Sequence, residues 1–189
     1  LVPGDSEGLL RKDYPTVDGL RASEVLLENV RVPASALVGA EGAASQTLNT
    51  VINRGILAIS AEAVGAMAVL YQSTIDYTKQ RVQFDHPLSE FQVVKHRLTE
   101  MFIEYNLAKS LCMKATMLLN QNSGDAQRHI HALKFLIGKT SRFVGQNAVQ
   151  LHGGMGMTED LAIAHYFKRL MMIDATFGHT DIHLDAFVQ

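Results

Sequence analysis

The sequence contains no tryptophan, one cysteine and four prolines among its 189 residues. The single cysteine, Cys112, excludes an internal disulfide, and its place on an apolar helical face predicts a packing role in a reducing compartment. The 17 basic and 19 acidic residues are nearly balanced and scattered along the chain. This excludes the concentrated positive charge typical of nucleic-acid-binding proteins, so we expect no nucleic acid among the partners.

The chain also lacks an uninterrupted apolar run long enough to cross a membrane. Its longest apolar stretch, 55–71, is broken by Ser60 and Glu62, whereas a membrane-spanning helix needs about 20 consecutive apolar residues. With 47% hydrophobic residues, the chain can nevertheless bury a substantial core. We therefore expect a folded, soluble protein with no membrane span.

The prolines divide the chain into two parts. Three of the four lie in the first 40 residues, where strand-like segments at 24–28 and 30–32 stand between turns. Beyond Gly42 only Pro87 remains, and Ala, Leu, Met and Gln dominate. This composition predicts a β-rich segment at 1–40, too small to fold alone, followed by a helical domain at 41–189.

Apolar residues recur at steps of three and four from Phe91 to Leu119 and again from Ile130 to Leu151. Long helices are therefore predicted near 43–79, 91–119 and 125–151, with a last helix from near Thr180. Helices joined by short loops pack most simply antiparallel. The predicted fold class is mainly α, an antiparallel four-helix bundle preceded by a short β-domain remnant.

Two segments carry the functional signal. Residues 81–92 read Arg-Val-Gln-Phe-Asp-His-Pro-Leu-Ser-Glu-Phe-Gln, and residues 150–156 read Gln-Leu-His-Gly-Gly-Met-Gly. A guanidinium offers forked donors to a pyrophosphate, an aromatic ring offers a surface to adenine, and glycines let backbone N–H groups approach a phosphate. Taken singly, Arg81 would be a solvated helix-end cation and the glycines a helix C-cap. Their spacing favours the binding function.

The two segments resemble the flavin-binding signatures of the acyl-CoA dehydrogenase family, with Asp85 where Gly is usual and Met157 where an aromatic residue is common. The resemblance implies acyl-CoA as substrate, α-proton abstraction and hydride transfer from the β-carbon to flavin N5. It implies FAD held across subunits of a homomeric or heteromeric dimer of dimers, with an electron-transferring flavoprotein as expected acceptor. The FAD-binding positions that it implies are Arg81, Gln83, Phe84, Phe91, Gln92, Gln150, Leu151, His152, Gly153, Gly154, His179, Thr180 and Asp181.

The same resemblance places the catalytic base at Phe177, where the family usually has Glu and where a benzyl group accepts no proton. Other members carry the Glu in the first helix, but residues 53–56, Asn-Arg-Gly-Ile, offer none. Glu62 is the nearest carboxylate in sequence, and we expect it to be solvated or interhelical. Gly178 is expected to contact substrate, and the N–H at position 177 to polarise the thioester carbonyl.

Two explanations for the missing Glu stay open. Segments 166–170 and 172–178 resemble the small subunit of pimeloyl-CoA-type dehydrogenases, in which two unlike subunits divide the functional parts. Alternatively, a carboxylate such as Asp174, or one in an N-terminal part, acts as the base. A bundle used only for assembly is a third possibility.

A metal site is not expected. His179 and His183 are four residues apart, as in a zinc-binding helix, but Thr180 follows the first His where the metalloprotease mechanism needs Glu, and no third ligand is evident. Because the sequence begins at Leu1, we expect the natural N-terminus to lie outside it. The inferred location, the bacterial cytoplasm, rests on the cysteine usage and on the resemblance.

Overall fold

The computed structural model describes residues 1–189, which form two compact units, Leu1–Ile52 and Asn53–Gln189. The first unit contains a hairpin of β1 (Leu9–Pro15) and β2 (Arg21–Leu27), paired antiparallel from Leu9 opposite Leu27 to Pro15 opposite Arg21. Most of its side chains are exposed on both faces. A lone hairpin is at best marginally stable in water. The segment therefore contains β-structure, as expected, and its inability to fold alone stays a prediction.

The predicted strand at 30–32 is wrong, and β1 was not predicted. Asn29 has a φ of 55° and turns the chain out of the sheet after β2, so Val30–Val32 has no partner strand. β1 escaped notice because neither face of the hairpin is buried, and its sequence therefore shows no alternation of apolar and polar residues. The 3-10 turn η1 (Ala34–Ala36) follows.

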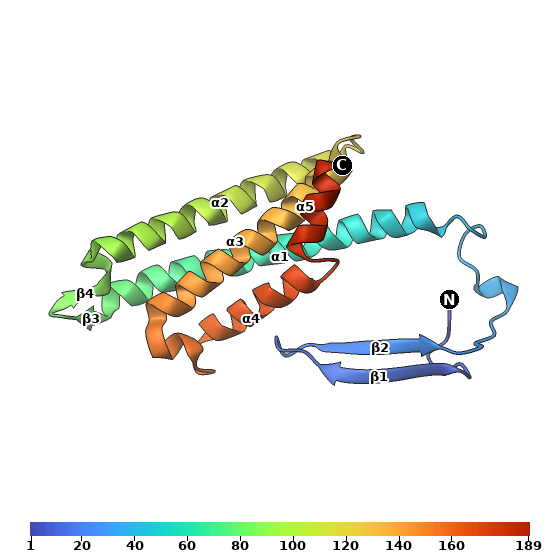
Figure 1. Ribbon diagram of the computed structural model, residues 1–189, viewed down its shortest axis with the longest axis horizontal. Helices are drawn as coiled ribbons and strands as arrows, with labels where there is room; N and C mark the ends of the chain where they lie inside the picture. The colour runs from blue at the N-terminus through green and yellow to red at the C-terminus, as the bar shows by residue number, and fades with distance from the viewer. The chain divides into compact units, whose positions relative to one another are not determined.

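The second unit holds the helical bundle. The long helices α1 (Ala44–Gln80), α2 (Gln92–Asn120), α3 (Ala126–His152) and α4 (Ala162–Ala175) lie side by side and alternate in direction (Figure 1). Between α1 and α2 lie the short strands β3 (Val82–Gln83) and β4 (His86–Pro87) and the turn η2 (Leu88–Glu90); η3 (Gly153–Met157) follows α3. The predicted mainly α, antiparallel bundle is confirmed.

One detail of that prediction is wrong. The bundle is not completed by a helix starting near Thr180, because α4 is its fourth long helix and α5 (Thr180–Val188) is an additional short helix packed against α3. The residue before α4 is Leu161, whose side chain offers no capping oxygen. The sequence therefore gives no start signal for this helix.

α3 is the central helix and lies closest to α2, α4 and α5. Its predicted stripe is completely buried from Ile130 to Ala148, at Ile130, Leu133, Ile137, Val144 and Ala148, and its last member, Leu151, is half-buried. Burial of apolar side chains contributes about 25 cal/mol per Å² and is the main force that holds the bundle together. The facing core residues are Ile56, Ala63, Met67 and Leu70 of α1, Met101, Ala108 and Ala115 of α2, and Ile163, Leu170 and Ile173 of α4.

α1 is long and apolar enough, by length and composition alone, to cross a membrane, a criterion that core helices of soluble proteins also meet. Here Ile56, Met67 and Leu70 are buried in the bundle core. Packing within the bundle therefore accounts for the buried part of this helix, whereas Leu48, Val51 and Val69 remain exposed.

Cys112 belongs to the same core. Burial raises the pKa of its thiol and outweighs the opposing hydrogen bond with Thr116. A buried thiol with a raised pKa is inert, so the predicted packing role is confirmed.

Candidate cofactor and substrate site

The junction between α1 and α2 is a tight hairpin. Phe84 and Asp85, with φ of 55° and 64°, form its two-residue turn between β3 and β4. Two left-handed residues are the requirement of a type I′ turn, for which Gly is favoured and Asp is tolerated. The Phe84 side chain is 85% exposed and meets the edge of Phe91 at 6.3 Å between ring centroids. The turn thus presents an aromatic ring to its surroundings.

The glycine segment follows the end of α3. Gly153 caps the helix with φ of 60°, so the helix C-cap interpretation holds. A Cβ at Gly156 would lie 2.7 Å from the carbonyl oxygen of Val149, so this position needs glycine. Gly153 and Gly154, in contrast, face open space. Their backbone is accessible to a ligand.

These two segments, about 70 residues apart in sequence, line one cavity of about 610 Å³. Arg81 lines it and makes no ion pair within the chain. A guanidinium without an internal partner, beside open glycine backbone, suits a phosphate group. The cavity-lining residues are Tyr77, Arg81, Gln83, Leu88, Gln150, Leu151, His152, Gly153, Gly154 and Met155. Of the predicted FAD-binding positions in these segments, Phe84, Phe91 and Gln92 lie outside the lining.

His152 forms the wall of this cavity. It is buried, its Nδ1 donates to the carbonyl oxygen of Ala148 at 2.8 Å, and its ring stacks on Tyr77 at 4.3 Å. The Tyr77 hydroxyl donates to the carbonyl oxygen of His152 at 3.4 Å. These contacts join the end of α3 to the end of α1 and hold the two segments together.

The segment expected to carry the base forms the turn between α4 and α5. Phe177 and Gly178 have φ of 60° and 101°, both left-handed. The Phe177 ring is 45% exposed and lies against Gly55 of α1, where a Cβ would come within 2.7 Å of Phe177 Cζ. Asn53, on the same helix, is nearly buried, and its Nδ2 donates to Gln127 Oε1 at 3.2 Å. Gly55 and Asn53 therefore offer no carboxylate at the position of Phe177.

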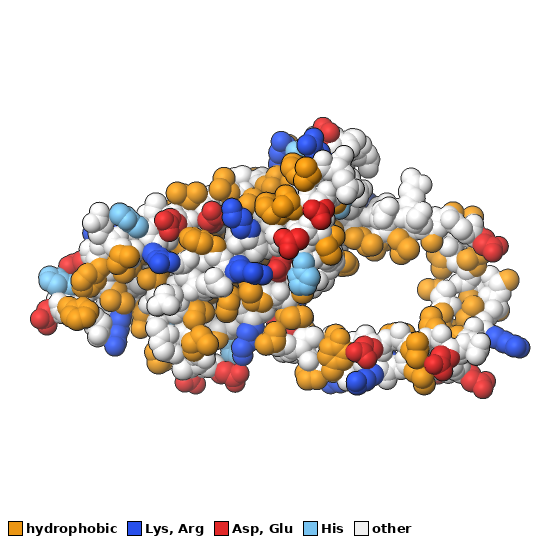
Figure 2. Space-filling model, viewed as in Figure 1, with side chains coloured by type: hydrophobic (Ala, Val, Ile, Leu, Met, Phe, Trp, Pro, Cys, Tyr) orange, Lys and Arg blue, Asp and Glu red, His pale blue; other side chains and the backbone are white.

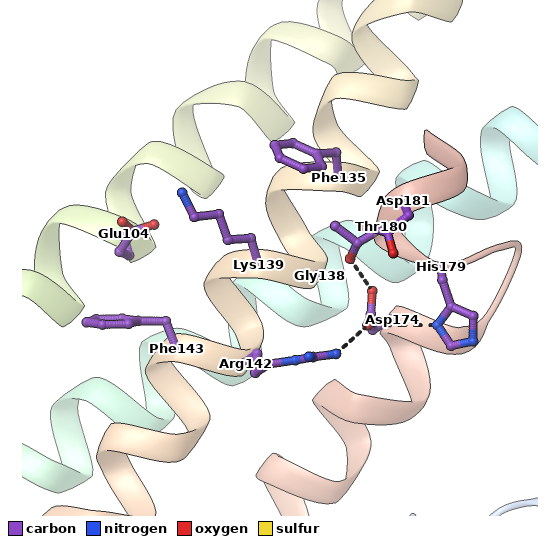
Figure 3. A pocket seen from close by; sticks show the side chains of 10 residues that line it. All are labelled: Glu104, Phe135, Gly138, Lys139, Arg142, Phe143, Asp174, His179, Thr180 and Asp181. Carbon is purple, nitrogen blue, oxygen red and sulfur yellow. Dashed lines mark hydrogen bonds and ion pairs between the residues drawn. The ribbon is translucent and has the colours of Figure 1, made fainter. Parts of the chain in front are cut away.

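Asp174, the alternative base, is buried and engaged at both oxygens. Its Oδ1 accepts from Thr180 Oγ1 at 2.7 Å, and its Oδ2 lies 3.3 Å from Arg142 Nη2 and 4.0 Å from His179 Nδ1 (Figure 3). Glu62, the other candidate, accepts from Arg169 Nε at 2.5 Å and Nη2 at 2.8 Å. The expectation that Glu62 is an interhelical carboxylate is confirmed.

A second cavity, of about 450 Å³, opens beside Asp174. It contains His179, Thr180 and Asp181, which therefore do not join the Arg81 cavity. Both cavities use α3, the first at 150–152 and the second at 135–143, a separation of roughly 10–26 Å at the helical rise of 1.5 Å per residue. The residues that line the second cavity are Glu104, Phe135, Gly138, Lys139, Arg142, Phe143, Asp174, His179, Thr180 and Asp181.

The comparisons with known proteins agree with this geometry. The sequence profile of the family "Acyl-CoA dehydrogenase, C-terminal domain" matches residues 41–189. The chain belongs to the acyl-CoA dehydrogenase family. It is 30% identical over 185 residues to a probable acyl-CoA dehydrogenase, YngJ, of Bacillus subtilis, covering 96% of this chain and 48% of that protein.

Two solved structures share the fold. The enzyme from Geobacillus kaustophilus matches 99% of this chain and 50% of its own, with a TM-score of 0.92 and 26% identity. The ChsE4–ChsE5 complex from Mycobacterium tuberculosis matches 99% of this chain and 50% of its own, with a TM-score of 0.88 and 22% identity, which shows the fold alone. The chain spans about half the length of the relatives it matches.

Sequence reasoning gave no role around the turn between α4 and α5 to Gly55, His131 or Lys134, and it considered His183 only as a possible metal ligand. For Lys134 the sequence did offer a signal, because a lysine stands directly beside Leu133 of the apolar stripe of α3. The structure shows that its side chain is completely buried. Gly55 and the two histidines carried none, since their contacts join helices that are distant in sequence.

Proposed function

We propose that this chain is the C-terminal half of an FAD-dependent flavoprotein that dehydrogenates an acyl-CoA thioester between its α- and β-carbons. Residues 1–40 would be the end of its middle β-domain and 41–189 its bundle domain. The observation that carries the proposal is the meeting of two distant segments at one cavity, with Arg81 free of any internal ion pair. The family relationship supports the same activity.

The residues of that cavity fit the phosphate-containing part of FAD. Arg81 would donate to the pyrophosphate, the amides of Gln83 and Gln150 offer further hydrogen bonds, and the open backbone at 153–154 leaves room for close approach. The exposed ring of Phe84 gives an aromatic surface for adenine. Bound FAD would supply the hydride acceptor of the reaction.

The separation of the two cavities supports a cofactor shared between subunits. One copy would hold FAD through the Arg81 cavity, while its own 179–181 segment would contact a second FAD held by a neighbour. α2 also exposes large apolar side chains, and apolar atoms lie along it in Figure 2, as expected of a surface that packs on another subunit. We therefore propose a dimer of dimers. The exposed apolar residues of α2 are Val93, Phe102, Ile103, Leu107, Met113 and Met117.

FAD content of the purified full-length protein tests the first proposal. Arg81→Gln should lose at least about tenfold in FAD affinity, because charged hydrogen bonds of this kind contribute about 1.5–3 kcal/mol. Lys79→Gln is the matched control: it removes an exposed positive charge two residues earlier on α1 and should leave FAD content unchanged. Unchanged FAD content in Arg81→Gln would instead favour a bundle used only for assembly.

A second candidate follows from the chemistry of the turn: a subunit that holds FAD and substrate while a partner subunit supplies the base. Phe177, Gly55 and Asn53 provide no carboxylate, and both oxygens of Asp174 are engaged. Among solved structures of the same fold, ChsE4–ChsE5 is itself a complex. The resemblance of 166–178 to the small subunit of pimeloyl-CoA-type dehydrogenases supports the same division. An electron-transferring flavoprotein remains the expected acceptor, and the bacterial cytoplasm the expected location.

Flavin bleaching by acyl-CoA thioesters under anaerobic conditions distinguishes the two candidates. Without a partner, the full-length protein should keep its colour, and Phe177→Glu should gain bleaching by at least about 100-fold, the lower range of general-base catalysis. Phe177→Gln, equal in size but unable to accept the proton, is the control and should gain nothing. Bleaching by the unmodified protein alone, lost in Asp174→Asn with FAD retained, would overturn the divided site and make Asp174 the base.

A further inference from the structure

The turn between α4 and α5 is held by two donors from outside the turn. Lys134 Nζ, completely buried, donates to the carbonyl oxygens of Asp174 at 2.8 Å and Gly178 at 2.9 Å. His183 Nε2 donates to the carbonyl oxygen of Phe177 at 2.9 Å. Left-handed backbone is unfavourable for a residue with a side chain, so Phe177 needs such restraint to keep its φ of 60°.

These contacts fix the backbone on both sides of the Phe177 N–H. On the preceding side, the Thr176 N–H donates to the carbonyl oxygen of Met172 at 3.0 Å, which ends α4. On the following side, His183 holds the Phe177 carbonyl. The Phe177 N–H itself donates to no backbone carbonyl of the chain. It is thus a directed donor that a ligand can use.

The tautomer of His183 is set by a chain of hydrogen bonds across three helices. Because His183 Nε2 donates to a carbonyl, neutral His183 has an unprotonated Nδ1, which accepts from His131 Nδ1 at 2.9 Å. His131 Nε2 is then an acceptor and receives the Gln127 Nε2–H at 3.3 Å. Gln127 Oε1 accepts from Asn53 of α1. With the Gln127 and Asn53 amides in these orientations, every link is satisfied only while both imidazoles are neutral.

Burial keeps the pair neutral. It is the main cause that lowers the pKa of His131, and the neighbouring His183 lowers it further. Burial is also the main cause that lowers the pKa of His183. The hydrogen bond to the Phe177 carbonyl raises this pKa, the charge of Lys134 lowers it further, and the charge of Asp174 raises it.

The groups that face His183 come from two helices. His131 and Lys134 are on α3 and Asp174 is on α4. On α5, Asp181 and Asp185 are two residues away and point to the other side of the helix. A proton added to His183 Nδ1 would leave Nε2 a donor to the Phe177 carbonyl, but it would face the N–H of His131 across 2.9 Å. Repulsion between the two rings would then displace His183 from that carbonyl.

We propose that His183 is a positioning residue: in the tautomer fixed by His131, it holds the Phe177 backbone so that its N–H can polarise the thioester carbonyl, and protonation of the pair releases it. The inference rests on the proposed acyl-CoA function. It adds to that function a pair of imidazoles, on α3 and α5, that does not contact the substrate. Protonation of this pair in acid weakens thioester binding.

The test uses the full-length, FAD-loaded protein and 3-thiaacyl-CoA thioesters of short, medium and long chain, in which sulfur replaces the carbon that would lose the hydride. Their binding is followed by the change in the flavin spectrum between about pH 8 and about pH 5, across the ordinary His range. The unmodified protein should bind progressively more weakly as the pair takes up protons. His183→Gln keeps an N–H donor that does not titrate, so its binding should lose this acid-dependent decline.

His183→Leu removes the donor and should weaken binding about 5- to 50-fold at every pH, the range expected when a buried carbonyl loses its partner. Hydrogen exchange of the amides at 176–179 should be faster in this variant than in the unmodified protein or in His183→Gln. His129→Gln, which changes a half-buried imidazole two residues from His131, is the control and should change neither measurement.

Binding by His183→Leu within twofold of the unmodified protein, with unchanged exchange at 176–179, would overturn the positioning role. Identical pH profiles for the unmodified protein and His183→Gln would overturn the pH dependence. The failure of the proposed function looks different: the unmodified protein would then bind no FAD or show no spectral change with any thioester, while the exchange measurement would still report on the turn.

Discussion

The phenyl ring of Phe177 lies over Gly55, so close that a Cβ on Gly55 would come within 2.7 Å of Phe177 Cζ. The turn after α4 and the helix α1 thus meet at the place where the family resemblance locates the catalytic carboxylate. Because Gly55 has no side chain, the Phe177 ring can lie against α1. The ring then occupies the space that the side chain of a base would need. Neither of these two residues offers a proton acceptor.

Gly55→Ala should change the free energy of unfolding by less than about 1 kcal/mol. Alanine in a helix gains about 1 kcal/mol over glycine, and the half-exposed ring of Phe177 can move aside at a similar cost. Thioester affinity should change, because the displaced ring borders the proposed substrate position. Chemical denaturation and flavin titration of the same preparation check both; a loss of several kcal/mol would show that the ring is fixed.

Gly138→Ala should be destabilising by about 1–3 kcal/mol, despite the same gain in helix propensity. A Cβ at Gly138 would collide with the side chains of Thr180 and Asp174, which are hydrogen-bonded to each other. Asp174 is buried and also paired with Arg142, so neither Thr180 Oγ1 nor Asp174 Oδ1 can move away without a substantial loss of free energy.

The matched control for Gly138→Ala is Gly65→Ala on α1, where a Cβ would face open space. That variant should be neutral or stabilised by up to about 1 kcal/mol. Urea unfolding of both variants decides; equal effects at the two positions would mean that the α4–α5 turn yields easily.

Lys134→Met should lower the free energy of unfolding by about 2–4 kcal/mol. Methionine fits the apolar surroundings but leaves the carbonyl oxygens of Asp174 and Gly178 without their buried donor. Lys139→Met, one turn later and exposed on the same helix, should stay within about 0.5 kcal/mol. A neutral result for Lys134→Met would show that the desolvation of the buried ammonium cancels the two hydrogen bonds that it donates.

Glu62→Gln should cost less than about 1 kcal/mol and leave catalysis unchanged. The ion pair with Arg169 joins α1 to α4, but the Glu62 side chain is 46% exposed, and pairs in contact with water contribute little. Flavin bleaching in the assembled enzyme and thermal unfolding check the two parts. A loss of bleaching above about 100-fold with FAD retained would make Glu62 the base.

The sequence predicted the features that repeat along a helix and missed those that arise where helices meet. The stripe from Ile130 to Ala148 was recognised because burial of one helix face imposes a period of 3.6 residues. β1 was missed because neither of its faces is buried. The link between His131 and His183, 52 residues apart, exists only because α5 packs on α3, and no local pattern encodes that contact.

The candidate site divides in the same way. The spacing of the segments at Arg81 and Gln150 predicted a cofactor site through family resemblance, and the structure brings both to one cavity. Sequence reasoning grouped His179 with them, although it lies at a separate cavity beside Asp174. The position of Gly55 opposite Phe177 depends on how α1 is rotated about its axis, which side-chain packing decides.

The His131–His183 pair should make the folded protein less stable in acid. Both pKa values are lowered in the folded state from the ordinary 6.5, mainly by burial, whereas the unfolded chain keeps the ordinary value. As the pH falls below 6.5, the unfolded chain therefore takes up protons first, and the free energy of unfolding decreases until the folded pair also titrates. Above about pH 7.5 both states are neutral at these positions, and the pair adds no pH dependence.

Urea unfolding at a series of pH values measures this effect. His183→Gln removes one titrating group of the pair and should flatten the decrease below pH 6.5, where both imidazoles otherwise begin to titrate in the unfolded chain. His129→Gln, which alters a half-buried imidazole on the same helix as His131, should leave the profile of the unmodified protein intact. If the two variants gave the same profile, the acid sensitivity would have to come from groups other than this pair.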